Sequence, residues 1–251
     1  MALVTRARLR FTALLAAAPL GILPLVPQTP APAPPLPGTL HYIAHWQIIP
    51  AGAATLSWSR VGGQTQVSFT ANSNDLVSLF YPVHDRMATG YNSASFCAER
   101  ADNHVVEGRR QRHTVIQYEP RRKRLVLDES DLTRPSAPAK HDVRSLPGCV
   151  LDLFSALDYI RAQPLHLGDV YDFPVNEGGK TAEVRLAIDL KGTITTPAGS
   201  FTAVRATPTI LGRAGPRPGR LWIWFSDDAR HLPVEIQGKV SWGTITAQLS
   251  N

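Results

Sequence analysis

Apolar and polar residues alternate along several parts of this chain. The alternation is regular at 66–70, 183–191 and 234–242. A period of two is typical of strands that bury one face, as antiparallel sheets do. Turn-forming segments such as Pro50-Ala51-Gly52 separate the alternating stretches. The pattern predicts a mainly β fold, a curved antiparallel sheet or half-open barrel of roughly ten to twelve strands.

One segment, residues 149–162, has helical periodicity instead. Apolar residues recur at helical spacing, at Val150, Leu153, Phe154, Leu157 and Ile160. Proline and glycine precede the segment and another proline follows it, which marks both ends of a helix. We expect one helix whose apolar side packs on the sheet. The polar side carries Asp158 and Arg161, which are expected to form an exposed pair.

The segment 221–225 is apolar on both faces of the expected strand and contains Trp222 and Trp224. Such a strand is covered on both sides or faces a cavity. Aromatic residues on the concave side of a curved sheet can hold an apolar ligand. Trp222, Trp224 and Phe154 are therefore candidate ligand-binding residues, and the alternative is that they are ordinary core.

The amino terminus resembles a targeting segment. Arginines at 6, 8 and 10 precede an apolar run that ends at residue 26. This order is typical of a secretory signal, and an uncleaved amino-terminal anchor is the alternative. Residues 27–38 are rich in proline and predict a semi-rigid linker. A single β-rich domain is then expected at 39–251, in an exported protein of the periplasm or cell envelope.

Charge is concentrated rather than spread evenly. The formal net charge is +6, from 26 basic and 20 acidic residues. Three arginines belong to the predicted leader. Seven other basic residues lie close together in the sequence: Arg109, Arg110, Arg112, Arg121, Arg122, Lys123 and Arg124. After export they predict an anionic lipid surface as partner rather than nucleic acid; the alternative is a solvated positive face that protects a sheet edge.

Cys97 and Cys149 are the two cysteines of the chain. In an oxidising compartment an even number of cysteines favours a disulfide. Two separate buried thiols are the alternative.

Several short segments occur in an order that resembles a known family. They are His45-Trp46 with Ile49-Pro50-Ala51-Gly52, Asp152 through Arg161, Thr196 through Val204, Trp222 through Asp228, and Gly243 through Leu249. Together they resemble the bacterial family called domain of unknown function 3108. The resemblance implies an exported β-rich protein with no agreed activity. It implies no catalytic residues, and the cysteines are not part of its pattern.

Candidate catalytic and metal-binding patterns are weak. His41 and His45 would share one face of a strand, but two ligands are too few for a metal site. Adjacent Asp227 and Asp228 favour a turn more than acid–base chemistry. We therefore expect no catalytic residue, metal or cofactor, and a non-enzymatic protein is favoured over an enzyme.

The leading hypothesis is a non-catalytic envelope protein that binds or carries an apolar or lipid-like ligand. A structural or assembly protein with an envelope protein as partner is the first alternative. An unrecognised hydrolase is the second.

Overall fold

The computed structural model describes residues 38–212, 217–218, 221–240 and 243–251. The predicted leader at 1–26 lies outside the described residues, and so does the linker except for Gly38. Within the described part of the chain, no helix is both long and apolar enough to span a membrane.

Strands make up most of the described chain. The strands are β1 Thr39–Trp46, β2 Ile49–Val61, β3 Gln64–Ser73, β4 His84–Asn92, β5 Ala98–Glu107, β6 Arg110–Glu119, β7 Arg124–Asp131, β8 Lys140–Ser145, β9 Val170–Glu177, β10 Lys180–Thr196, β11 Gly199–Leu211, β12 Arg217–Pro218, β13 Leu221–Ser226, β14 Pro233–Val240 and β15 Gly243–Leu249. The helices are α1 Asp75–Ser78 and α2 Leu153–Arg161, with a 3-10 turn at Pro120–Arg122.

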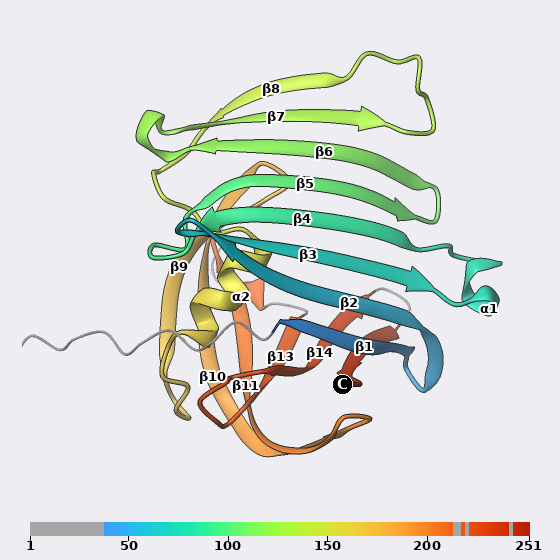
Figure 1. Ribbon diagram of the computed structural model, residues 1–251, viewed down its shortest axis with the longest axis vertical. Coiled ribbons are helices and arrows are strands. Elements are labelled where there is room, and N and C mark those ends of the chain that lie inside the picture. Colours follow the sequence, from blue (N-terminus) through green and yellow to red (C-terminus); the bar gives the residue numbers. More distant parts are fainter. Residues whose placement is uncertain (1–37, 213–216, 219–220, 241–242) are drawn as a thin grey trace, which may run out of the picture. The chain divides into compact units, whose positions relative to one another are not determined.

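All of these strands belong to one antiparallel sheet (Figure 1). Its order is β8-β7-β6-β5-β4-β3-β2-β1-β15-β14-β13-β11-β10-β9, with β12 paired beside β11. The sheet is open, because its edge strands β8 and β9 do not pair with each other. The predicted mainly β fold with a helix packed on it is therefore confirmed.

The sheet holds 15 strands, more than the predicted number. Strand β8, with sequence Lys-His-Asp-Val-Arg-Ser, has no buried residue and therefore no hydrophobic alternation. Such a strand is held by its backbone hydrogen bonds to β7. The register between the two strands cannot be recognised in the sequence.

Helix α2 begins later than its apolar periodicity predicts. The segment before it is extended, and Leu151 forms an isolated parallel bridge with Val175. Asp152 then caps the helix: its carboxylate accepts from the Ser155 amide, and the Ser155 hydroxyl accepts from the Asp152 amide. Phe154, Leu157 and Ile160 join one core cluster with residues from strands at both ends of the chain.

The polar side of α2 is buried, contrary to the sequence-based expectation of an exposed pair. Arg161 is 1% and Asp158 4% exposed, and their side chains are 2.8 Å apart. Arg161 also donates to the carbonyls of Arg230 and His231, at 2.9 and 3.1 Å. Asp158 accepts a hydrogen bond from the Tyr91 hydroxyl. The helix is thus surrounded by protein on both sides, because the sheet curls around it.

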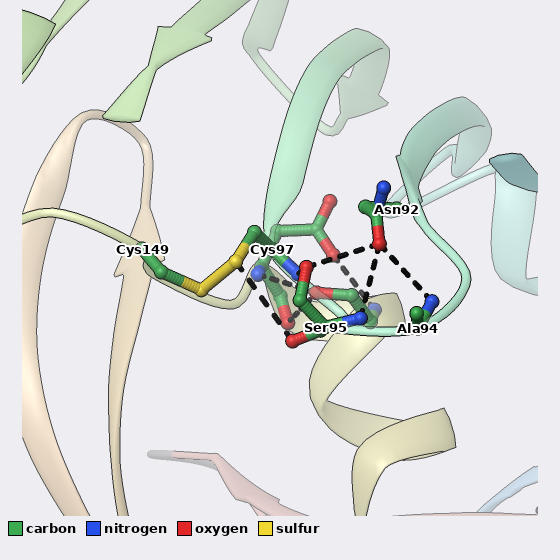
Figure 2. The surroundings of a disulfide bond; sticks show 7 residues. Asn92, Ala94, Ser95, Cys97 and Cys149 are labelled. Atoms are coloured by element: carbon green, nitrogen blue, oxygen red, sulfur yellow. Dashed lines mark hydrogen bonds between the residues drawn. A yellow bond between two sulfur atoms is a disulfide. The ribbon is translucent and has the colours of Figure 1, made fainter. Parts of the chain in front are cut away.

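Cys97 and Cys149 form a disulfide in this structure (Figure 2). Cys97 lies at the end of the turn between β4 and β5, where Asn92 Oδ1 accepts from the amides of Ala94 and Ser95. Cys149 lies just before α2. The bond therefore joins the β4–β5 turn to the segment that leads into the helix.

Replacing both cysteines by serine is expected to lower the free energy of unfolding by roughly 2–4 kcal/mol, because the bond closes a long loop in the unfolded chain. Urea denaturation of the Cys97→Ser/Cys149→Ser protein measures the loss. Thiol titration of the denatured, unreduced protein is the control. Two free thiols per chain would contradict the disulfide.

Removing one partner of the buried pair should be costly, since the other charge stays buried without it. Arg161→Met and Asp158→Leu are each expected to lower the free energy of unfolding by about 3–5 kcal/mol. In the double variant, the free energy of unfolding should fall by clearly less than the sum of the decreases in the two single variants. Denaturation of the four proteins gives the coupling energy, and additive losses would show that the pair contributes no net interaction.

Candidate ligand-binding groove

A groove of about 530 Å³ lies on the inner face of the sheet, beside the start of α2. Strands β4 to β8 form its floor, while α2 and the β9–β10 turn form its other wall. The apolar lining consists of Met87, Ala101, Val105, Ile116, Leu153 and Phe154. The cations that line it are Arg110, Arg112, Lys140, Arg144 and Lys180.

Strand pairing gives the groove an apolar end and a charged end. Residues directly opposite each other on paired strands share a face of the sheet. Along β5 and β6 the opposite pairs on the groove face are Ala101 with Ile116, Asn103 with Thr114, Val105 with Arg112, and Glu107 with Arg110. The lining therefore changes from buried aliphatic residues near α2 to exposed charges at the β5–β6 turn.

Hydrogen bonds hold the inner end of the groove in place. The Thr89 hydroxyl donates to the Asp152 carboxylate at 2.5 Å, which connects β4 to the cap of α2. Burial raises the pKa of Asp152 above its ordinary value, while the hydrogen bonds from Thr89 and Ser155 act in the opposite direction. The Tyr118 hydroxyl donates to Asn176 at 3.3 Å, across the gap between β6 and β9.

Arg144 connects the two edges of the open sheet. From β8 it donates to the carbonyls of Gly178 and Gly179 in the β9–β10 turn, at 3.4 and 3.0 Å. It also donates to Asp142, which holds the pKa of that carboxyl below its ordinary value. One side of the groove is thus closed by side chains rather than by strand pairing.

The cations of the rim differ in how far they are neutralised. Arg112 contacts Glu129 at 2.7 Å, whereas Arg110 is 4.0 Å from Glu107. Lys180 has no ionic partner within the described residues. The groove is lined by five cations and four carboxylates, one of which is the buried Asp152. Asp142, which lies 3.7 Å from Lys140 and 2.8 Å from Arg144, adds a further carboxylate beside the groove, so the exposed rim has an excess of one positive charge.

Of the three aromatic residues predicted to bind a ligand, Phe154 lines this groove and Trp222 and Trp224 do not. On β13 Ile223 and Phe225 are buried, whereas Trp222 and Trp224 are half-buried, and Trp224 packs against the core cluster. The Arg205 guanidinium lies 5.9 Å from the ring centroid of Trp224. Neither tryptophan therefore lines the groove together with Phe154.

The two basic segments lie at opposite ends of β6. Arg109, Arg110 and Arg112 lie at or near the β5–β6 turn, while Arg121, Arg122, Lys123 and Arg124 lie at the β6–β7 turn. The 10 residues of β6 separate them by about 30 Å. Glu119 binds Arg122 and Arg124 at 3.1 and 2.9 Å. The seven residues therefore form two separate groups, and the first contributes Arg110 and Arg112 to the groove.

Lys140, Arg144 and Lys180 of the rim were not singled out by the sequence. The register of β6 to β8 could have placed Lys140 and Arg144, whereas Lys180 on β10 joins them only because the two edges of the open sheet approach each other. The weaker chemical candidates are engaged elsewhere: Asp227 contacts Lys191 at 2.6 Å and Asp228 contacts Arg230 at 2.7 Å. In the described part of the chain, no group of three or more His, Cys, Asp or Glu residues could hold a metal.

Comparison with known proteins identifies the family and the fold. A solved beta-barrel-like protein of domain of unknown function DUF1849, from Brucella abortus, superposes with a TM-score of 0.55 at 8% identity. The alignment covers 87% of this chain and 97% of that chain, and at this identity it shows a shared fold alone. No curated protein matches the sequence. The family model "Protein of unknown function (DUF3108)" matches residues 41–250, so the chain belongs to this family of unknown function.

Proposed function

We propose that this protein is exported and binds an amphipathic ligand, whose apolar part lies against Phe154 and whose anionic group lies at the basic rim. The observation that carries the proposal is the change from apolar to charged lining along one groove. A ligand with one apolar and one charged end matches both parts of such a site. The protein itself needs no reactive group for this role.

The size and lining of the groove support a small ligand. Its volume of about 530 Å³ lies in the range typical of small-molecule sites. Leu153 at the first turn of α2 is 48% exposed although it is apolar, and it faces the groove. Covering this side chain with an apolar group would remove it from water.

The charged rim supports an anionic group on the ligand. Lys180 lacks an ionic partner among the described residues, and the ion pair of Arg110 with Glu107 is long, at 4.0 Å. A carboxylate or phosphate would give Lys180 a partner and Arg110 a second one. Arg144, by contrast, is already engaged and acts as part of the wall.

Export is supported by the disulfide and by the predicted leader. Disulfides persist in oxidising compartments and are rare in the cytosol. An exported protein of the periplasm or cell envelope would be close to membrane lipids, which are amphipathic ligands of the kind proposed.

A structural or assembly role is the second candidate. It is favoured by the edge strand β8, which pairs with β7 alone within the described sheet. A partner protein could add a strand there. Lys140 and Arg144 on this strand weigh against it, since charged edge residues oppose strand addition.

Filling the groove should weaken ligand binding. Thr114 lies in the middle of the groove floor, and the neighbouring Val115 lies on the other face of the same strand. We expect Thr114→Trp to weaken binding of a dansylated fatty acid at least about tenfold, equivalent to ~1.4 kcal/mol. The matched variant Val115→Trp should bind as the unmodified protein does. Fluorescence titration measures both; equal affinities in the two variants would contradict the groove as the binding site.

A further inference from the structure

Three turns of the chain meet at one end of the sheet, on the right of Figure 1. They are the β1–β2 turn, the β3–β4 connection that contains α1, and the β5–β6 turn. Asn74 donates from its side chain to the Pro50 carbonyl at 2.7 Å, which joins the first two. The Gly108 amide donates to the Pro82 carbonyl at 2.8 Å, which joins the third.

This end exposes large apolar side chains to an unusual degree. The apolar tip, as we call it, consists of Ile48, Ile49, Leu76, Leu79 and Phe80. Ile48 is 91%, Phe80 84% and Leu79 77% exposed. A single exposed leucine needs no explanation, but several large apolar residues on adjoining turns mark an interaction surface.

The turns that carry the tip are well ordered by local contacts. The Asn74 side chain caps α1 by accepting from the Val77 amide, and the hydroxyls of Ser73 and Ser78 are 2.7 Å apart. Gly108 has a φ of +58°, and a Cβ there would approach the Tyr81 ring to 2.6 Å. The Tyr81 ring therefore lies directly on the β5–β6 turn. The apolar side chains are held in water by a defined backbone, which is costly unless something covers them.

We propose that the apolar tip inserts into the surface of a lipid bilayer. The five side chains come from two adjoining turns, Ile48 and Ile49 from the β1–β2 turn and the other three from the β3–β4 connection, while the third turn adds a cation, Arg109. Apolar side chains on turns can enter the headgroup region individually. Arg109 at the β5–β6 turn is exposed and has no ionic partner within the described residues, so it favours anionic headgroups.

Charge around the tip is otherwise balanced. Arg110 is 4.0 Å from Glu107, and Asp75 is exposed on α1. Insertion therefore depends mainly on the apolar side chains, and Arg109 adds a preference for anionic lipid. The second basic segment, at Arg121 to Arg124, lies at the far end of β6 and would not contact the same bilayer surface.

Docking by the tip would also place the groove at the bilayer. Glu107 and Arg110 line the charged end of the groove and belong to the β5–β6 turn that adjoins the tip. An amphipathic ligand could then pass between groove and membrane with its charged group near the headgroups. The docking proposal itself does not depend on the groove holding a ligand.

A polarity-sensitive fluorophore tests insertion residue by residue, on the protein recovered after export. Attached at Leu79→Cys, the probe should shift to shorter wavelength on vesicles that contain phosphatidylglycerol and be quenched by spin-labelled lipid. Attached at Arg121→Cys, at the far end of β6, it should stay solvent-like. Because each probe reports its own position, membrane binding through the amino terminus cannot imitate this result.

Affinity provides the second measurement. Leu79→Ser/Phe80→Ser should weaken vesicle binding about tenfold or more, and Arg109→Gln roughly fivefold at low salt. Val61→Ser is the control for the apolar variant, because Val61 is 67% exposed and lies at the opposite end of β2. Arg121→Gln is the control for Arg109→Gln. Both controls should bind as the unmodified protein does. All these side chains are exposed, so folding is not at risk.

A solvent-like signal at position 79 on bound protein, or no binding to any vesicle, would overturn the proposal. The proposal would also be overturned if the fluorescence of the probe at position 79 changed with protein concentration in the absence of vesicles. Such a change would show that the tip mediates self-association. A groove variant such as Thr114→Trp should dock normally. Loss of ligand binding and loss of docking are therefore separable.

Discussion

The ion pair between Arg161 and Asp158 is the interaction on which the rest of this structure depends. An open sheet of this size leaves a large apolar concave face, and α2 fills it. A helix that is enclosed needs its polar side satisfied as well as its apolar side buried. Asp158 accepts from Tyr91 of β4, while Arg161 donates to the carbonyls of Arg230 and His231 beyond β13. One pair thus joins the helix to two distant parts of the sheet.

The groove follows from this arrangement. Helix α2 occupies only part of the concave face. The part of the sheet that lies beside the start of the helix is not covered by it and forms the floor of the groove. Thr89 and the cap residue Asp152 fix where the helix starts, and the disulfide at Cys149 fixes the segment just before it. Arg144 then closes the gap between the sheet edges. The open part of the floor is where β5 and β6 change from apolar to charged residues.

The sequence predicted the parts of this fold that have a local signal. Alternation identified the antiparallel sheet, and helical spacing identified α2 to within a few residues. The ordered segments identified the family. The buried state of Arg161 had no such signal, because a charged residue opposite an apolar stripe normally faces water. The separation of the two basic segments and the place of Arg112 and Lys140 at the rim depend on strand register, which a single sequence does not display. Lys180 joins them through the approach of the two sheet edges, which has no local signal either.

The positions of the aromatic residues relative to the groove also had no local signal in the sequence. Trp222 and Trp224 were grouped with Phe154 because all three are large and apolar, yet only Phe154 lines the groove, while Trp224 is half-buried against the core cluster. The apolar tip was not predicted either. Ile48 and Phe80 lie in turns, where apolar residues carry no periodicity, and only the fold shows that their turns adjoin.

The central claim, that the groove holds an amphipathic ligand, is tested most directly by native mass spectrometry of the protein purified from its own envelope, followed by lipid extraction. Our account predicts a bound small molecule with an acidic group, which is absent from the Thr114→Trp protein. Recovery of the bare polypeptide mass alone, with nothing in the extract, would contradict it.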